Sequence, residues 1–245
     1  MKNTIKYLFQ RILGYPRYLI WFAHYKIHTL HTDVQEKDFF YFVSLIQPDK
    51  GAILDIGANL GIMTYHLSKR FPSTPIFAFE PIQSNYEALN TIINNYQLSN
   101  VILHPFALGN ESKEVEMVLP IQGKTKLQGL SHVKHETITE WNEGEIVQVS
   151  MKKLDEILSN EFISAIKMDV ENFEYFVLQG GVELIKKNKP IIYTELWANL
   201  NREHCIELLE SLGYSTYIVL RYNLVRYSPH YQHHQNFIFI PIETN

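Results

Sequence analysis

Two groups of residues in consecutive apolar runs have the chemical types needed to bind a nucleoside. Residues 52–61 read Ala-Ile-Leu-Asp-Ile-Gly-Ala-Asn-Leu-Gly, an apolar run that ends in Asp55 and a turn with two glycines. Glycines in such a turn let the backbone pass close to a ligand because no Cβ is in the way. Glu80 closes a second apolar run, Ile76–Phe79, where a carboxylate can accept both hydroxyls of a ribose. The pair predicts a site for an adenosine-containing small molecule.

The spacing of the glycines distinguishes between candidate ligands. A dinucleotide fingerprint needs glycines at relative positions 1, 3 and 6, and these positions hold Gly57, Asn59 and Ile62. The second glycine, Gly61, falls at the fifth position, and the full Gly-x-x-x-x-Gly-Lys-Ser/Thr phosphate loop is absent from the sequence. Asp55 would repel a phosphate but suits an ammonium group. S-adenosylmethionine has an ammonium, a ribose and no phosphate, so it is the predicted ligand. NAD, or a turn without a ligand, is the alternative.

Acids also end two later predicted strands, on the side of the sheet edge where a second substrate would lie. Asp169 and Glu195 are therefore the candidate catalytic residues, because an acceptor hydroxyl benefits from a base within hydrogen-bond reach. Asp169 could instead cap a helix that starts at Asn172, and Glu171 is interpreted as a cap. Three such carboxylates could hold Mg²⁺, but acids are common in clefts without a metal, and we expect none.

Composition limits the class of partner and compartment. The sequence has 22 Lys and Arg against 26 Asp and Glu, a net charge of −4, which argues against nucleic acid as a main partner. A single cysteine, Cys205, excludes internal disulfides and is compatible with a reducing cytosol. No segment reaches the roughly 18–20 unbroken apolar residues of a membrane span, and no signal peptide is recognised. We expect a cytoplasmic protein that can lie peripherally at a membrane.

Residues 1–37 differ from the rest of the chain in being basic and aromatic. They contain six Lys and Arg against two acids, and Gly14, Tyr15 and Pro16 separate two short predicted helices. We favour an arm that packs on the domain or on a partner subunit, which would make an oligomer. The alternative is an interfacial helix whose cations meet anionic headgroups.

Residues 38–245 read as one α/β domain. Apolar runs and amphipathic segments alternate in the rhythm of a parallel sheet, interrupted by an excursion over residues 110–150 near the acceptor site. The predicted strands are 52–56, 76–80, 101–104, 165–168 and 191–194, with 115–119 and 146–149 in the excursion and an antiparallel pair, 216–220 and 236–240. The predicted helices are 38–46, 60–70, 83–96, 172–187 and 201–212, and a mobile loop is expected over 121–144. This pattern predicts a doubly wound, Rossmann-like, seven-stranded and mostly parallel sheet with a C-terminal antiparallel strand.

Five motifs resemble, in their order and spacing, those of the FkbM-type class I methyltransferases. They are Asp55-Ile56-Gly57-Ala58-Asn59-Leu60-Gly61, Phe79-Glu80-Pro81, Ala107-Leu108-Gly109, Ile166-Lys167-Met168-Asp169-Val170-Glu171 and Asn236-Phe237-Ile238-Phe239. The resemblance covers roughly residues 50–241 and leaves the arm out. The family usually has Gly where this chain has Asn172, and Asn tolerates the left-handed conformation better than most residues, so we expect the turn to be kept.

The resemblance implies an S-adenosylmethionine-dependent O-methyltransferase that acts on a hydroxyl of a small molecule or glycan. The cofactor site that it implies consists of Asp55, Gly57, Ala58, Asn59, Gly61, Glu80, Pro81 and Ala107. Two alternatives remain: a non-catalytic module that keeps the cofactor pocket, and an NAD-dependent oxidoreductase. Acids at all four strand ends argue against the first, and the glycine spacing argues against the second.

Overall fold

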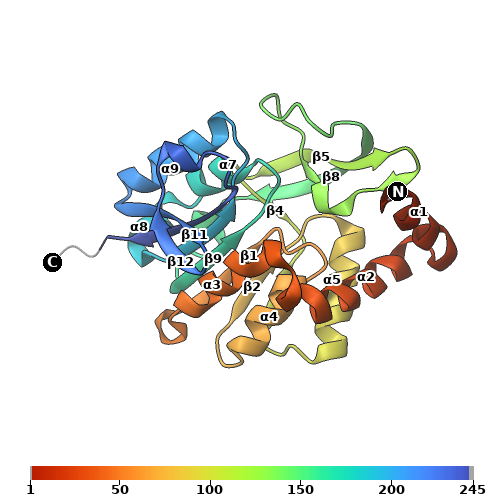
Figure 1. The fold of residues 1–245 in the computed structure, drawn as a ribbon, viewed down its shortest axis with the longest axis horizontal. Helices are drawn as coiled ribbons and strands as arrows, with labels where there is room; N and C mark the ends of the chain where they lie inside the picture. Colours follow the sequence, from red (N-terminus) through yellow and green to blue (C-terminus); the bar gives the residue numbers. More distant parts are fainter. Residues whose placement is uncertain (1, 243–245) are drawn as a thin grey trace.

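A large sheet forms the centre of the computed structural model, which describes residues 2–242 (Figure 1). Its eight strands lie in the order β12-β11-β13-β10-β9-β1-β2-β3. Their bounds are β1 Ala52–Ile56, β2 Ile76–Phe79, β3 Val101–His104, β9 Ile163–Met168, β10 Ile191–Glu195, β11 Tyr214–Leu220, β12 Asn223–Arg226 and β13 Asn236–Pro241. Neighbours from β3 to β10 pair in parallel, and β13 pairs antiparallel with both β10 and β11. The predicted doubly wound fold is confirmed.

The sheet has one strand more than the seven that were predicted. Strands β3 to β11 form the predicted set with β13 as its antiparallel member, and β12 adds an edge strand. The turn between β11 and β12 consists of Arg221 and Tyr222, both with positive φ, of 49° and 64°. Such a two-residue turn matches the twist of a hairpin, but neither residue type indicates it, which explains why β12 escapes prediction.

Helices cover both faces of the sheet (Figure 1). One face packs against α7 Glu174–Gln179, α8 Val182–Asn188 and α9 Leu200–Ser211, and the other against α3 Lys37–Leu45, α4 Ile62–Arg70 and α5 Gln83–Tyr96. Side chains of a strand alternate between faces: Leu54 and Ile56 pack in the first core, and Ile53 packs in the second. Asp55 must therefore point to the α4 face.

The helix predicted over 172–187 is two helices, α7 and α8. They separate at Gly180 and Gly181, where a Cβ on Gly180 would lie 1.9 Å from the carbonyl oxygen of Gly109. The chain bends there because its backbone packs directly against another backbone segment.

Residues 107–152 form an ordered second sheet, which includes the predicted strands 115–119 and 146–149 and part of the stretch 121–144 that was predicted to be a mobile loop. It contains β4 Ala107–Leu108, β5 Lys113–Gln122, β6 Thr125–Lys126, β7 His132–Val133 and β8 Gly144–Lys152, and α6 Leu154–Ile157 follows it. The stretch 121–144 includes β6, η4 Gln128–Leu130 and β7, and buries His132 between Leu130 and Asn142. Polar composition thus predicted mobility where side-chain hydrogen bonds hold a fixed structure. The other short 3₁₀ helices are η1 Leu30–Thr32, η2 Val34–Glu36, η3 Pro48–Lys50 and η5 Pro229–Tyr231.

The arm folds into the two predicted helices, α1 Lys2–Leu13 and α2 Tyr15–Thr29. Helix α2 packs on the domain as favoured above, with Tyr18, Leu19, Ala23 and Ile27 buried against α4 and α5. Helix α1 is held at β6, where Gln10 donates to the Lys126 carbonyl at 3.1 Å and accepts from its amide at 3.3 Å. No helix in the described range 2–242 has the length and hydrophobicity to cross a bilayer.

Candidate active site

The glycine turn after β1 passes directly against the end of β9. Gly57 has a φ of 73°, and a Cβ there would lie 1.9 Å from the carbonyl oxygen of Asp169. The amides of Gly57 and Ala58 both donate to the Phe79 carbonyl, at 3.1 and 2.9 Å. The turn thereby brings the ends of β1, β2 and β9 together, and only glycine fits at its first position.

We expect Gly57→Ala to lower the free energy of unfolding by about 3 kcal/mol, because the new Cβ both meets a backbone oxygen and requires a strained φ. The matched control is Gly123→Ala. Gly123 also has a positive φ, 64°, but a Cβ there meets nothing within 4 Å, so only the strain of about 1–2 kcal/mol applies. Urea unfolding of both variants measures the difference. Equal losses would show that the contact with Asp169 does not restrict the turn.

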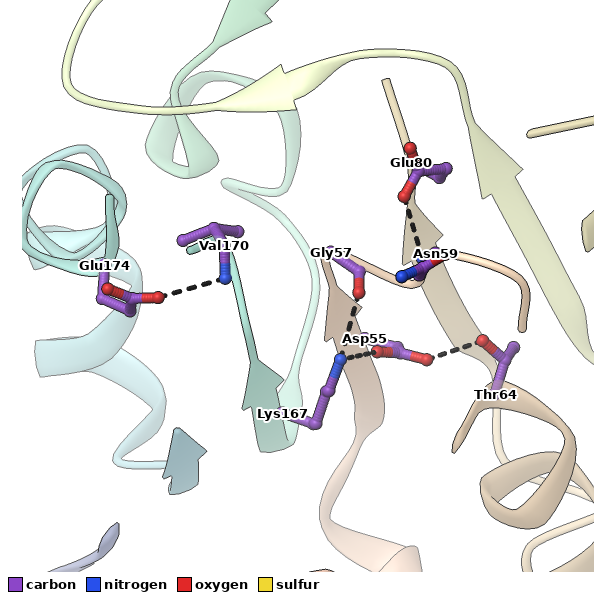
Figure 2. A network of polar contacts seen from close by, with 8 residues as sticks. All are labelled: Asp55, Gly57, Asn59, Thr64, Glu80, Lys167, Val170 and Glu174. Carbon is purple, nitrogen blue, oxygen red and sulfur yellow. Dashed lines mark hydrogen bonds and ion pairs between the residues drawn. The ribbon is translucent and has the colours of Figure 1, made fainter. Parts of the chain in front are cut away.

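Asp55 lies beneath the turn in a buried polar network (Figure 2). Its Oδ1 is 3.2 Å from Lys167 Nζ, and its Oδ2 accepts from Thr64 Oγ1 at 2.6 Å. Lys167 is the register partner of Asp55 on β9, and its ammonium also donates to the Gly57 carbonyl at 3.1 Å. The role expected for Asp55 is therefore corrected: strand alternation turns its carboxylate toward α4, where it holds the turn through Lys167. Asp55 does not face the ligand cavity.

Glu80 faces a cavity beside the turn, where its carboxylate is held by backbone donors. Its Oε2 accepts from the Asn59 amide at 2.8 Å, and its Oε1 accepts from the Ile82 amide at 2.9 Å and from Asn85 Nδ2 at 3.4 Å. Burial raises the pKa of Glu80 to about 7, and these hydrogen bonds oppose the shift. A carboxylate fixed in this way keeps further lone pairs for donors on a ligand.

The same cavity, called the first cavity below, contains three buried amide oxygens that lack donors. They are Asn59 Oδ1, Asn85 Oδ1 and Gln128 Oε1, each without a hydrogen-bond partner among the residues described. Buried acceptors without a partner are unfavourable, so these oxygens indicate a ligand rich in N–H and O–H groups. Apolar side chains complete the wall, including Phe106 and Leu108. A nucleoside, with hydroxyls, an amino group and a flat apolar base, has the matching chemistry.

The first cavity is small. Its volume is about 50 Å³, below the roughly 300 Å³ of a typical ligand pocket. Gln128, Gly129, Ser131 and Val133 of the excursion contribute to its wall. We expected the excursion near the acceptor. The structure places it on the first cavity, and the residues that line the second cavity lie outside 110–150.

The remaining predicted site residues fall into clear groups. Gly57, Asn59, Glu80, Pro81 and Ala107 line the first cavity, whereas Ala58 and Gly61 lie outside its lining. Ala58 is buried in the small core beneath α5, and a Cβ on Gly61 would lie 2.1 Å from Leu89 Cδ1. These two residues therefore shape the turn and pack it against α5, and they do not form the wall of the cavity.

The second cavity, of about 370 Å³, lies on the other side of Asp169. Asp169 lines both cavities, and Glu195 lines the second. The two candidate catalytic residues are thus brought to one wall, as the strand order predicts. Burial raises the pKa of Asp169, although nearby Lys167 opposes the shift. Burial and the Asp169 charge raise the pKa of Glu195 to about 7.

The turn after β9 keeps its shape although the glycine usual in the family is replaced. Asn172 has a φ of 73°, its Oδ1 accepts from Asn199 Nδ2 at 2.8 Å, and its carbonyl accepts from Asn201 Nδ2 at 2.9 Å. The expectation of a left-handed Asn is confirmed. The acid that binds the Val170 amide is Glu174, at 3.1 Å, and not Asp169 (Figure 2).

Several site residues were not predicted. Lys167 interrupts an apolar strand, and a lysine in such a run must find a buried partner, so its pairing with Asp55 could have been expected. Tyr193 lies among apolar residues on β10, so its sequence context indicates a core residue and not a site residue. Asn85 and Gln128 carry no local signal, because only the packing of α5 and the excursion brings them to the cavity. Within residues 2–242, no three His, Cys, Asp or Glu side chains are grouped so as to hold a metal ion.

The raised pKa values predict how stability depends on pH. Burial raises the pKa of Glu80 and Glu195 to about 7 and that of Glu174 to about 8, against about 4.3 in the unfolded chain. The native state therefore binds more protons than the unfolded state between these values. The stability that these groups contribute is complete below about pH 4.3 and is lost as the pH rises through 7 to 8.

We thus expect the melting temperature of the ligand-free protein to fall between about pH 5 and pH 8. Scanning calorimetry at several pH values measures this, with Glu80→Gln as a variant that flattens the slope near pH 7. A melting temperature that rises steadily through this range would contradict the burial of these carboxyls.

Comparison with known proteins gives the family. The family model for the methyltransferase FkbM domain matches residues 55–216. Methyltransferase 1 of Beauveria bassiana (strain ARSEF 2860) is 26% identical over 147 residues, which cover 54% of this chain and 59% of that relative. The crystal structure of methyltransferase FkbM from Methylobacillus flagellatus KT shares the fold, with a TM-score of 0.52 at 15% identity, over 98% of this chain and 59% of that one. Because the family model spans more than half of the sequence, this chain belongs to the FkbM methyltransferase family.

Proposed function

We propose that this chain is an S-adenosylmethionine-dependent O-methyltransferase that acts on a hydroxyl of a small molecule or glycan. One observation carries the proposal: Asp169 lies in a wall shared by two cavities. One cavity has the chemistry for a nucleoside, and the other is large enough for an acceptor. Transfer of a methyl group to a hydroxyl benefits from a base close to the point where the methyl donor and the acceptor meet. A carboxylate in the shared wall is in this position. The family membership of the chain supports this proposal.

The polar groups of the first cavity support the assignment of the cofactor to it. Glu80 would accept from the ribose hydroxyls, as its place at the end of β2 suggests. The free amide oxygens of Asn59, Asn85 and Gln128 would accept from the remaining N–H and O–H donors. When bound, S-adenosylmethionine supplies a methyl group activated by its sulfonium.

The acceptor would enter the second cavity with one hydroxyl directed at Asp169. Asp169 can take the hydroxyl proton as the oxygen forms its bond to the methyl carbon, while the electrons of the broken carbon–sulfur bond stay on sulfur. Burial raises the pKa of Asp169, which makes it a stronger base than an exposed aspartate. Glu195, in the same wall, would orient the acceptor. Positioning of the two substrates supplies much of the acceleration in such a reaction.

The experiment is a transfer assay with methyl-labelled S-adenosylmethionine and a panel of hydroxylated small molecules and sugars. We expect formation of adenosylhomocysteine that depends on the acceptor, with the label found on oxygen by product mass analysis. Label on nitrogen or carbon would contradict O-methylation. Cofactor binding without transfer to any acceptor would favour a non-catalytic module, and oxidation of NADH would favour an oxidoreductase.

A further inference from the structure

The second cavity has an excess of negative charge that methyl transfer alone does not require. Four carboxylates line it: Glu36 from η2, Asp38 from α3, Asp169 after β9 and Glu195 at the end of β10. The ammonium of Lys167 is also in the wall, but it is engaged by Asp55 and by the Gly57 carbonyl. The imidazoles of His233 and His234 complete the set of titratable groups from the C-terminal segment.

The carboxylates affect one another within this space. Burial, followed by the charges of Asp169 and Glu36, raises the pKa of Glu195 to about 7. Burial also raises the pKa of Glu36 and of Asp38. Like charges near one another in a cavity disfavour ionisation, and a cation placed among them reverses this effect. The cavity is therefore electrostatically suited to a positively charged ligand.

A second observation points to a ligand in the same cavity. Tyr193 is only 4% exposed and lines the cavity, and its ring packs against Phe39 and Phe42. Its hydroxyl has no hydrogen-bond partner in the part of the chain that the structure describes. Burial, followed by the charges of the four carboxylates of the cavity, raises the pKa of Tyr193. The hydroxyl thus stays protonated beside the carboxylates and can donate to a polar guest.

We propose that the methyl acceptor carries a protonated amine close to the hydroxyl that is methylated, as in an amino alcohol or an amino sugar. The amine lies among the carboxylates of Glu36, Asp38 and Glu195, and Tyr193 donates to an oxygen of the acceptor. Asp169 is left to receive the reacting hydroxyl. This inference rests on the proposed function and narrows its substrate class. It also excludes acceptors with phosphate or carboxylate groups, which the four acids would repel.

The test compares three sugars of similar size that differ in charge: glucosamine, glucose and glucuronate. Calorimetry at about pH 7, where the amine of glucosamine is mostly protonated, measures the binding of each sugar to the full chain in the presence of saturating adenosylhomocysteine. A charge-assisted contact predicts that glucosamine binds at least about tenfold more tightly than glucose. Glucuronate should bind more weakly than glucose.

Two variants link the preference to this cavity. Glu195→Gln should reduce the ratio of the affinities for glucosamine and glucose several-fold. Tyr193→Phe should weaken the binding of glucosamine by about fivefold, the size of one hydrogen bond. Neither should change the affinity for adenosylhomocysteine, because both side chains lie outside the first cavity.

Equal binding of the three sugars, tighter binding of glucuronate, or no binding of glucosamine would overturn the inference. So would Mg²⁺ that binds to the chain and displaces glucosamine, because the guest would then be a metal ion. If adenosylhomocysteine itself does not bind, the proposed function has failed, and this inference fails with it. Cofactor binding without a preference for the cation contradicts the acceptor class alone.

Helix α1 carries an independent feature, an exposed apolar face. Ile5, Leu8 and Ile12 are 53%, 53% and 69% exposed. Beside them, Phe9, Trp21 and Tyr25 form an exposed aromatic ladder, with ring centroids 5.0 and 5.9 Å apart and planes within 10°. The first 32 residues of the sequence contain five Lys and Arg and no acid.

We infer that this face of α1, with the aromatic ladder, lies against an anionic membrane surface. Apolar and aromatic side chains enter the interface of a bilayer while Lys and Arg meet the headgroups, and Arg11 and Arg17 are exposed on the two helices. Each such cation increases the partition coefficient by about fivefold when it reaches an anionic surface. Because helix α2 packs on the domain, the exposed apolar face of α1 has a defined orientation relative to the domain.

Sedimentation of the full chain with vesicles tests this second inference. Vesicles of phosphatidylcholine with phosphatidylserine should retain the protein at least about tenfold better than phosphatidylcholine alone. Leu8→Glu with Ile12→Glu should abolish this retention. Phe162→Glu is the matched control, because Phe162 is 68% exposed but lies next to Gly51 at the other end of the strands. No retention by anionic vesicles, or a dimer that the double variant dissociates, would overturn the inference.

Discussion

Replacing Glu80 with Gln is expected to raise the dissociation constant for S-adenosylmethionine by about 10–150-fold. The variant keeps the size of the side chain and removes the charge that makes hydrogen bonds from ribose hydroxyls strong, a loss of about 1.5–3 kcal/mol. The backbone amides of Asn59 and Ile82 fix the carboxylate in place, so Glu80 itself is already positioned for the ribose hydroxyls. Calorimetric titration of both proteins measures the effect.

Glu87→Gln is the matched control for this change. Glu87 lies on α5, seven residues after Glu80, with its side chain exposed and bonded to Gln83. The Glu87→Gln variant loses the same charge, but the substituted side chain does not contact the first cavity. The affinity of this variant for the cofactor should therefore match that of the wild type. An equal loss of cofactor affinity in both variants would show that the effect comes from the overall charge of the chain. No loss of affinity in Glu80→Gln would show that Glu80 does not contribute to the cofactor site.

Replacing Asp169 with Asn is expected to lower kcat by about 10²–10⁴-fold, the usual contribution of a positioned base. The dissociation constant for the cofactor should change far less, because Glu80 and the amide oxygens lie elsewhere in the first cavity. Single-turnover assays combined with calorimetric titration separate the two effects. The variant is almost isosteric, and the Asp169 amide, which donates to the Ile56 carbonyl at 3.0 Å, is retained.

Glu195→Gln provides the contrast for Asp169→Asn. Glu195 lines only the second cavity, so its loss should raise the KM for the acceptor more than it lowers kcat. If Asp169→Asn weakens the cofactor and turnover equally, Asp169 belongs to the cofactor site or to the turn against Gly57. If it changes neither, the base is another group.

The parts of the fold that follow from local pattern could be predicted. The strands β1, β2, β9 and β10 are apolar runs closed by acids or glycines, and their alternation with amphipathic helices implies a parallel sheet. The placement of Glu80, Asp169 and Glu195 along one edge of the sheet could be predicted because strand ends of a parallel sheet meet there. The second cavity was predicted in position, although not in charge, because Glu36 and Asp38 come from the segment before the sheet.

The parts that depend on register or long-range packing could not be predicted. Asp55 was assigned to a ligand because the sequence does not show that Lys167 is its neighbour on β9. The polar stretch 121–144 was read as mobile, since composition does not reveal that His132 finds two buried partners. Gln128 reaches the first cavity only because the excursion folds back over it.

Titration of residues 1–245 with S-adenosylmethionine in a calorimeter tests the central claim most directly. We expect one binding site per chain, competition by adenosylhomocysteine, and an affinity that falls below about pH 7 as Glu80 becomes protonated. NADH should give no binding heat. Binding of NADH in place of S-adenosylmethionine, or cofactor binding that is indifferent to Glu80→Gln, would contradict the assignment of the first cavity.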